Sequence, residues 1–346
     1  MEINGKIDPA IYKIAVVGAG SWGTAIADLL ACKGFQVELW AFEKDVKNQI
    51  EATRENKLFL PEHTLSANLS SSNDLTGVVS HKDLIVIVVP SHVMRAVTQK
   101  MSGHLSTDTI VASASKGIEQ KTHLTMSGVI KETLPEIKED RLAVISGPSF
   151  AKEVAQKMPT SVTVACKNAP TASLIQHVFA TAYFRVYTSD DIIGVELGGS
   201  AKNVVAIAAG MLDGLGLGLN TRAALMTRGM TEIRRLGLQL GANPRTFTGL
   251  AGFGDLVLTC TGNLSRNYTV GIQLGRGKKL QEILDEMHMV AEGVKNAKSI
   301  YNLSRKLGVE MPICREIYRI LYEELAPKEA VYHLMTRTLR QELDEN

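Results

Sequence analysis

In the first half of the chain, short apolar runs of the β type alternate with helical patterns. The run Leu-Ile-Val-Ile-Val-Val at residues 84–89 is apolar without a break, which is typical of a parallel strand buried on both faces of a sheet. Helical patterns at residues 24–33 and 91–100 lie between such runs. This alternation predicts βαβ units and a doubly wound sheet. The expected strands are residues 13–17, 36–40, 84–89, 109–113 and 142–145, followed by 161–165 and 184–188 on either side of a helix at 172–180.

The pattern changes after about residue 190. From there on the apolar positions recur at helical spacing, and glycine-rich or polar loops at residues 214–218, 249–254 and 262–267 interrupt them. We therefore expect an α/β fold with a Rossmann-type doubly wound domain over residues 1–189 and an all-α substrate domain over residues 190–346. A chain of this size can bury a large core without disulfides or metals.

Composition and charge narrow the class of protein. The chain has 346 residues, and 38 Lys and Arg residues nearly balance 36 Asp and Glu residues, which gives a formal net charge of +2. A general nucleic-acid-binding protein would carry a concentrated basic excess, so we expect no nucleic-acid partner. The four cysteines stand singly, which favours reduced thiols. The start of the chain does not resemble a secretory signal, and the apolar stretches are too short or too interrupted for a transmembrane segment, so we expect a cytoplasmic protein.

A glycine-rich turn follows the first expected strand. Its sequence, GAGSWG at residues 18–23, fits the dinucleotide-binding pattern and lies between a strand and a helix, as that pattern requires. Gly18 would permit the tight turn, Gly20 the close approach of a pyrophosphate, and Gly23 the close packing of helix on sheet. The alternatives are a glycine-rich turn without a ligand and, for Trp22, simple packing beneath the helix.

The end of the second expected strand bears on the choice of cofactor. In domains of this type an acidic residue about 20 positions beyond the glycine motif accepts a hydrogen bond from the ribose of NAD. Glu43 stands at that distance, whereas the neighbouring Lys44 could instead meet the 2′-phosphate of NADP. Glu43 could equally be a solvated residue at the start of a helix. The sequence therefore leaves NAD and NADP open.

The pair Lys202-Asn203 opens an almost wholly apolar helical stretch. An ammonium held there would be partly desolvated, and desolvation lowers the pKa of a lysine toward the range useful for proton transfer. A second pair, Lys295-Asn296, stands among charged residues and is expected on a solvated helix face. A lysine in a helix is more often structural than catalytic, so the assignment of Lys202 needs support from other segments.

Four loop segments offer that support. Asp255 follows the glycine-rich residues 249–254 and places a carboxylate just before an apolar run, although it could be only a helix N-cap. The triplet Ser265-Arg266-Asn267 offers a guanidinium, which suits a bidentate contact with a phosphate, although it could be only a surface loop. Ser146-Gly147-Pro148-Ser149 and Ser115-Lys116-Gly117 follow expected strands, and ligands of open α/β sheets bind at such carboxyl ends.

Other chemistries find little support. The sequence contains no Walker motif, no HExxH and no CxxC, so nothing indicates a P-loop nucleotidase or a zinc hydrolase. We therefore expect no metal.

Taken together and in order, these segments closely resemble the bacterial NAD(P)-dependent glycerol-3-phosphate dehydrogenases. The resemblance runs from about residue 12 to residue 325, and the ordered combination is specific although no single motif is. It rests on residues 18–23, 90–92, 115–117, 146–151, 197–204, 220–223, 252–255, 265–267 and 290–293.

The resemblance implies reversible reduction of dihydroxyacetone phosphate to sn-glycerol 3-phosphate by hydride transfer from NADH or NADPH, which supplies glycerophospholipid synthesis. It implies that Lys202 is the general acid and base, and that Asp255 orients and tunes it. Lys116 is implied at both substrate and cofactor, and Arg266 at the substrate and near the cofactor. The other implied substrate contacts are Gly147, Ser149, Asn203, Ser265 and Asn267, and the implied dinucleotide contacts include Ser21, Trp22, Ala151, Val290 and Glu292.

One departure from the family pattern concerns the cofactor. After the second strand this family often has His or Arg, whereas this chain has Phe42 and Glu43. The departure weakens any inference of an NADP preference and leaves the implied reaction unchanged.

Two other functions stay open at this point. A hydroxyacid dehydrogenase can share the two-domain plan and the helix-borne Lys-Asn pair, and it would take a carboxylate instead of a phosphorylated substrate. A non-catalytic dinucleotide sensor could keep the fold without the reaction, although the joint presence of Lys202, Asp255 and Arg266 argues against it. The oligomeric state is open as well, with a homodimer as one alternative.

Overall fold

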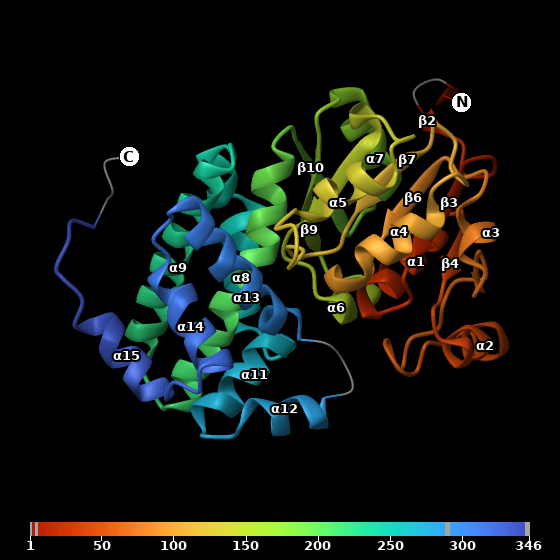
Figure 1. The fold of residues 1–346 in the computed structure, drawn as a ribbon. Coiled ribbons are helices and arrows are strands. Elements are labelled where there is room, and N and C mark those ends of the chain that lie inside the picture. The colour runs from red at the N-terminus through yellow and green to blue at the C-terminus, as the bar shows by residue number, and fades with distance from the viewer. Residues whose placement is uncertain (1, 4–5, 288–290, 343–346) are drawn as a thin grey trace.

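A computed structural model describes residues 2–3, 6–287 and 291–342, and shows a sheet layered with helices on one side of the molecule and a bundle of helices on the other (Figure 1). The sheet has eight strands in the order β10-β9-β8-β7-β6-β3-β4-β5. Neighbouring strands are parallel except β8 and β9, which are antiparallel. The strands are β3 (Lys13–Val17), β4 (Gln36–Trp40), β5 (Leu69–Ser72), β6 (Leu84–Ile87), β7 (Ile110–Ser113), β8 (Leu142–Ser146), β9 (Thr160–Cys166) and β10 (Phe184–Ser189), and β1 (Glu2–Ile3) and β2 (Lys6–Ile7) form a separate antiparallel pair.

Both faces of the sheet are buried, as the unbroken apolar runs predict. Along β3, Ile14 and Val16 pack into one apolar cluster, whereas Ala15 and Val17 pack into another on the opposite face. All four residues of β6 are buried. The doubly wound sheet is therefore confirmed. The helices and turns of this half are α1 (Ser21–Cys32), α2 (Lys44–Thr53), α3 (Leu75–Val79), η1 (Ser91–Val93), α4 (Met94–Met101), α5 (Met126–Thr133), η2 (Glu139–Arg141), α6 (Ala151–Ala155) and α7 (Ala169–Phe179).

The second half of the described chain is helical, as expected. Its central element is α8 (Ile192–Gly214), whose N-cap Asp191 accepts a hydrogen bond of 2.9 Å from the backbone N–H of Gly194. The other elements are α9 (Leu219–Gln239), η3 (Pro244–Thr248), η4 (Leu250–Gly254), α10 (Asp255–Thr261), α11 (Arg266–Gly275), α12 (Leu280–Glu286), α13 (Glu292–Leu307), α14 (Pro312–Tyr322) and α15 (Pro327–Met335).

Helix α8 forms the core of this half. Its residues Leu197, Ala201, Val204 and Val205 are fully buried and belong to one apolar cluster with residues of the surrounding helices. Within the described residues, α8 alone is long and apolar enough to cross a membrane, and 94% of that stretch is buried inside the protein. Its apolar composition is therefore accounted for by packing within the bundle.

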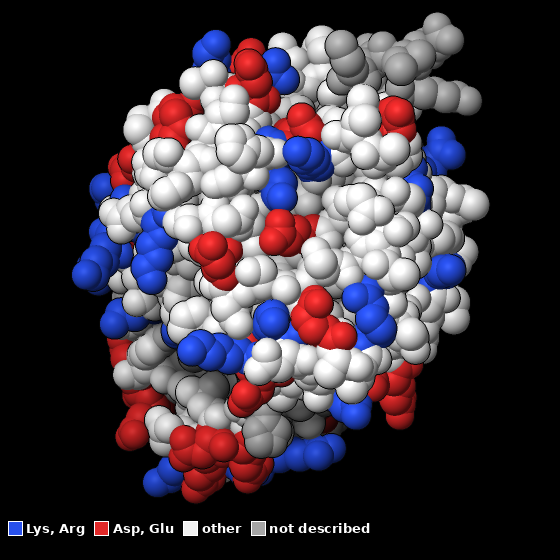
Figure 2. Space-filling view, turned by 90° about the vertical axis from the view of Figure 1, so that its right-hand side faces the viewer, with Lys and Arg blue, Asp and Glu red and all other residues white. Residues whose placement is uncertain are grey.

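Charged side chains are mixed over the surface. On the face shown in Figure 2, acidic and basic residues are interspersed and form no continuous basic band. This distribution agrees with the near balance of charges in the sequence.

Candidate active site

Lys202 lies in the middle of α8, and its side chain reaches the first turn of α10. Its Nζ donates hydrogen bonds to Oδ1 of Asp255 and, over 2.8 Å, to Oγ1 of Thr259. Both charged residues are buried, with 6% of Lys202 and 1% of Asp255 exposed. Thr259 donates in turn to the backbone carbonyl oxygen of Asp255 over 2.6 Å. The lysine that the sequence indicates for proton transfer is thus held in a compact, buried ion pair.

A second ammonium reaches the same carboxylate from the sheet. Lys116 follows β7, and its Nζ donates to Oδ2 of Asp255 over 2.7 Å. The same Nζ lies 3.5 Å from the carbonyl oxygen of Gly147, which follows β8. The side chain of Lys116 keeps 19% of its surface exposed, so it borders both the buried cluster and solvent. The cluster therefore forms at the carboxyl ends of β7 and β8, where open α/β sheets bind ligands.

Burial lowers the pKa of Lys202 from its ordinary value of 10.5 to about 8, because the charged form loses its hydration. The carboxylate of Asp255 opposes this change, and the ammonium of Lys116 adds to it. A lysine with a pKa near 8 exchanges its proton close to neutral pH, which is the property required of a general acid and base.

Two glycines of α8 permit this close arrangement. A Cβ on Gly198 would lie 2.3 Å from the carbonyl oxygen of Ala251, and one on Gly199 would lie 2.6 Å from Oγ of Ser146. Ala251 belongs to η4, a π-helical turn that leads directly into Asp255, and turns of this kind are frequent at functional sites. The N-cap of α10 is Gly254, so Asp255 is the first residue of the helix and its carboxylate faces α8 instead of capping.

The loop after β8 lies beside Lys116. Gly147 has a φ of +143°, and a Cβ there would lie 2.9 Å from Cα of Val162, so both the backbone conformation and the space require glycine. Ser149 donates from Oγ to the carbonyl oxygen of Gly147 over 3.0 Å. These two residues, which the family resemblance implies as substrate contacts, therefore border the cluster.

The start of α11 holds the next group of indicated residues. Ser265 caps the helix, and its Oγ accepts a hydrogen bond of 3.3 Å from the backbone N–H of Tyr268. Asn267 is buried, and its Oδ1 accepts a hydrogen bond of 2.9 Å from the N–H of Gly293. A Cβ on Gly293 would lie 2.7 Å from the carbonyl oxygen of Asn203. The structure thus brings Asn203 and Asn267 together around one glycine of α13.

Arg266 and Glu292 influence each other electrostatically. Desolvation lowers the pKa of Arg266, and the carboxylate of Glu292 raises it. Glu292 begins α13, and its Oε1 accepts a hydrogen bond of 3.0 Å from the backbone N–H of Ser91, which follows β6. Burial raises the pKa of Glu292, and the hydrogen bond from Ser91 opposes that change. Val290, another indicated residue, lies outside the described residues.

The glycine turn after β3 has the geometry of a dinucleotide-binding turn. Gly18 has a φ of +117°, and a Cβ there would lie 2.6 Å from the carbonyl oxygen of Val88, which directly follows the adjacent β6. A Cβ on Gly23 would lie 1.9 Å from the carbonyl oxygen of Gly18, so α1 packs directly on the turn. A Cβ on Gly20 would meet nothing within 4 Å. The turn therefore leaves open space at the position where a pyrophosphate approaches the backbone.

Two residues that the family resemblance implies at the cofactor pack against one apolar cluster near this turn. Trp22 and Ala151 both lie against a small apolar cluster made of Ala25, Leu60 and Ala155. Trp22 therefore has the packing role that the sequence offers as its alternative, and it also lies beside the other indicated residue. Ser21, between Gly20 and Trp22, is the first residue of α1.

The residues that bear on cofactor preference lie after β4. Glu43 is the N-cap residue of α2, but its side chain makes no capping hydrogen bond within the described chain. Glu43 and Lys44 are both exposed, as is 74% of Phe42. Because an acidic and a basic side chain are equally accessible here, the structure leaves the preference between NAD and NADP open.

Two residues at the cluster and its border are not among those that the sequence indicates. Thr259 has a recognisable signal, because it lies four residues after Asp255 and therefore on the same face of a helix. Asn296 was expected on a solvated helix face, and that expectation is wrong, since the side chain is 0% exposed. It lies one turn after Glu292 on α13, on the face that packs against α8.

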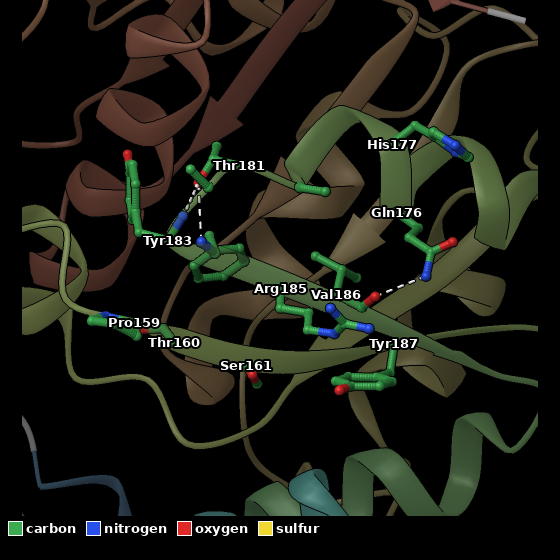
Figure 3. A pocket seen from close by; sticks show the side chains of 13 residues that line it. Pro159, Thr160, Ser161, Gln176, His177, Thr181, Tyr183, Arg185, Val186 and Tyr187 are labelled. Carbon is green, nitrogen blue, oxygen red and sulfur yellow. Dashed lines mark hydrogen bonds between the residues drawn. The ribbon is translucent and has the colours of Figure 1, made fainter.

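A cavity of about 570 Å³ opens along the edge strand β10, apart from this cluster (Figure 3). Within it the guanidinium of Arg185 lies over the ring of Tyr187, 5.2 Å from its centre, and Gln176 donates to the carbonyl oxygen of Val186 over 2.7 Å. None of the residues that line this cavity belongs to the cluster around Lys202. We assign it no part in the chemistry.

Comparison with known proteins gives the family. The model of the NAD-dependent glycerol-3-phosphate dehydrogenase N-terminus matches residues 13–172, and the model of the C-terminus of the same family matches residues 191–332. Among the solved structures, glycerol-3-phosphate dehydrogenase from Coxiella burnetii matches with a TM-score of 0.90 and 42% identity, over 94% of this chain and 99% of that one. D-mandelate dehydrogenase, at 15% identity and a TM-score of 0.60, shares the fold alone.

Two bacterial relatives are more similar in sequence. A glycerol-3-phosphate dehydrogenase (NAD(P)+) of Syntrophobacter fumaroxidans is 56% identical over 331 residues, which cover 96% of this chain and 97% of the relative. One of Syntrophotalea carbinolica is 53% identical and is covered over 99% of its length. The chain therefore belongs to the NAD-dependent glycerol-3-phosphate dehydrogenase family.

Proposed function

We propose that this protein catalyses the reversible reduction of dihydroxyacetone phosphate to sn-glycerol 3-phosphate, with NADH or NADPH as hydride donor, and so supplies glycerophospholipid synthesis. The observation that carries the proposal is the buried cluster of Lys202, Asp255 and Lys116 at the carboxyl ends of the strands. Reduction of a carbonyl group requires a proton donor beside the carbon that receives the hydride. The family to which the chain belongs supplies the matching chemistry, since its relatives bear the name of this reaction.

Lys202 is the proton donor in the proposed reaction. It gives a proton to the carbonyl oxygen of the substrate during reduction and takes the proton back during oxidation. With a pKa of about 8, both of its forms are populated near neutral pH. Asp255 holds the ammonium in place, and Lys116 occupies the second oxygen of that carboxylate. The nicotinamide supplies the hydride when it is bound.

The phosphate of the substrate is proposed to bind at the start of α11. Arg266 offers a planar guanidinium there, which matches two phosphate oxygens at once. The Oδ1 of Asn267 is engaged by Gly293, which fixes its amide nitrogen as the end that donates hydrogen bonds. The other proposed substrate contacts are Lys116, Gly147, Ser149, Asn203 and Ser265.

The dinucleotide is proposed to bind at the turn after β3. The open space at Gly20 and the first N–H groups of α1 suit a pyrophosphate, because helix N-termini attract anions. The acid after β4, Glu43, is proposed to meet the ribose. The proposed cofactor contacts are Gly18, Gly20, Ser21, Trp22, Gly23, Glu43, Lys116, Ala151, Arg266 and Glu292, and Val290 lies outside the described residues.

A panel of carbonyl acceptors tests this function. We expect cofactor oxidation with dihydroxyacetone phosphate and inhibition by phosphate-bearing analogues, and little turnover of 2-oxo acids that lack a phosphate. Turnover of a 2-oxo acid alone would favour the hydroxyacid dehydrogenase. Cofactor binding without turnover of any ketone would favour the non-catalytic sensor.

The organisation of the enzyme belongs to the same proposal. We infer that residues 1–189 bind the cofactor and residues 190–346 the substrate, since β10 ends at Ser189 and α8 begins at Ile192. The four free cysteines of the protein suit a reducing cytoplasm, which is the proposed location.

Exposed apolar side chains at Leu219, Tyr332 and Met335 offer the kind of surface that a homodimer would cover. Sedimentation velocity tests the dimer, and a monomer at micromolar concentration would exclude it.

A further inference from the structure

Residues 116–118, which lie shortly after β7, are inserted between the two halves of the molecule. Lys116 reaches Asp255 of α10, and Ile118 is buried in the apolar cluster formed by α8 and its neighbouring helices. Gly117, between them, is packed so closely that a Cβ would lie 2.5 Å from Oγ of Ser91 and 3.1 Å from Oδ1 of Asn296. The position of Lys116 therefore depends on how residues 116–118 fit into the helical half.

Asn296 is the side chain of α13 that meets this segment. It is 0% exposed, and its Nδ2 donates over 3.4 Å to the carbonyl oxygen of Ser200, two residues before Lys202 on α8. Its Oδ1 is buried and has no hydrogen-bond partner within the described residues. Burial of an amide that is only half satisfied costs free energy, so its presence calls for a reason other than the stability of the helix pair.

We propose that Asn296 is a positioning residue: its amide donates to the carbonyl oxygen of Ser200 on α8, its Oδ1 packs against Gly117, and the two contacts together fix how far Lys116 reaches toward Asp255. The inference rests on the function proposed above. It adds a residue that contacts neither substrate nor cofactor and acts through Lys116. The same helix face carries Glu292, which accepts from the N–H of Ser91, so two polar side chains one turn apart on α13 meet the segments after β6 and β7.

The expected consequence concerns the acidity of Lys202. The ammonium of Lys116 lowers the pKa of Lys202, and the carboxylate of Asp255 raises it. If Lys116 withdraws, its repulsion is lost and Asp255 interacts with Lys202 alone, so both changes raise the pKa of Lys202. The titratable groups that face Lys202 are Lys116, Asp255 and Cys260. Glu292 and Lys295 precede Asn296 on its own helix, and Lys295 acts electrostatically on Glu292 and on His92 after β6.

The pH dependence of kcat/KM in Asn296 variants tests this role. Asn296→Leu keeps the branched shape of the side chain, with bulkier methyl groups, and removes both polar ends, and Asn296→Ser keeps a small polar group that cannot span the gap. We expect the limb of the pH profile assigned to Lys202 to move to higher pH by at least roughly half a unit in both variants.

Ser299→Ala is the matched control. Ser299 is equally buried on the next turn of α13 and has its own contact with the carbonyl oxygen of Lys295 at 3.5 Å. This variant should leave the pH limb in place, even where its Tm falls. An unshifted profile in a folded Asn296 variant, or an equal shift in Ser299→Ala, would overturn the role of Asn296. A wild-type enzyme without turnover would overturn the proposed function, and with it this inference.

Discussion

The ammonium of Lys116 and the carboxylate of Asp255, 139 residues apart in the chain, are joined by a hydrogen bond of 2.7 Å. One follows a strand of the sheet and the other begins a helix of the second half, so this bond links the two halves at the cluster. The other oxygen of Asp255 holds Lys202. One carboxylate therefore organises two ammonium groups, and the acidity of the proton donor depends on contacts across the boundary between the halves.

Replacing Lys202 by methionine should remove the proton donor while keeping the volume of the side chain. We expect kcat to fall by about 10²–10⁴-fold, the usual contribution of a positioned acid or base. Asp255 keeps Lys116 as its partner, so the variant should stay folded. Stopped-flow or steady-state oxidation of NADH measures the loss, and fluorescence should show unchanged NADH binding. Lys306→Met, which alters an exposed lysine of α13, serves as the control. Near-normal turnover of the Lys202 variant would remove this residue from the mechanism.

The two directions of the reaction should respond oppositely to pH. Reduction needs protonated Lys202, so its kcat/KM should fall as pH rises through about 8, the pKa of this lysine. Oxidation needs the neutral amine, so its kcat/KM should rise through the same pH. Full pH profiles in both directions, with the stability of the protein checked at each pH, measure this crossing. If kcat/KM instead rose with pH in both directions, or fell in both, a group other than Lys202 would control the pH dependence.

Arg266→Ala should chiefly affect the recognition of phosphate. A charge-assisted hydrogen bond contributes about 1.5–3 kcal/mol, so kcat/KM for dihydroxyacetone phosphate should fall by about tenfold to a hundredfold. The kcat/KM for unphosphorylated dihydroxyacetone should change far less. The ratio of kcat/KM for the two substrates therefore reports the loss of phosphate recognition. Arg276→Ala, at the exposed far end of α11, is the matched control. An equal loss of kcat/KM with both substrates would show that Arg266 does not act through the phosphate group.

Two glycines of the same turn should give different defects. Ala at position 20 enters open space, so Gly20→Ala should keep the Tm while weakening NADH binding, because the methyl group occupies the approach of the pyrophosphate. Ala at position 23 would place its Cβ 1.9 Å from a backbone oxygen, so Gly23→Ala should lower the Tm by several degrees. Calorimetry and fluorescence titration separate the two effects. A stable Gly20→Ala variant with unchanged NADH affinity would argue against the assigned cofactor site.

The sheet could be predicted from the sequence because its strands are buried on both faces and carry unbroken apolar runs. Strand β6 is the clearest case, with all four residues buried. Strand β5 was missed, since it reads Leu-Ser-Ser-Ser and lies at the edge of the sheet, where polar residues are tolerated. Two of its four residues, Leu69 and Ser71, are buried, but one of these is a polar serine, so the apolar alternation that marks a strand is weak.

Individual site residues could be indicated from the sequence, but their contacts could not. Lys202 stands out because a charge in an apolar helix demands a reason, and the glycines at 18–23 stand out by their spacing. The bond between Lys116 and Asp255 depends on how two halves of the chain pack, which no local pattern encodes. At Asn296 the sequence is misleading, because its charged neighbours indicate a solvated helix face whereas the side chain is buried.

The central claim is tested most directly by following the oxidation of NADH and NADPH in parallel, with dihydroxyacetone phosphate as acceptor and absorbance as readout. We expect rapid oxidation and formation of sn-glycerol 3-phosphate. The ratio of kcat/KM for the two cofactors reports whether Glu43 and Lys44 favour NADH or NADPH. The prediction would be contradicted if neither cofactor were oxidised although both bind.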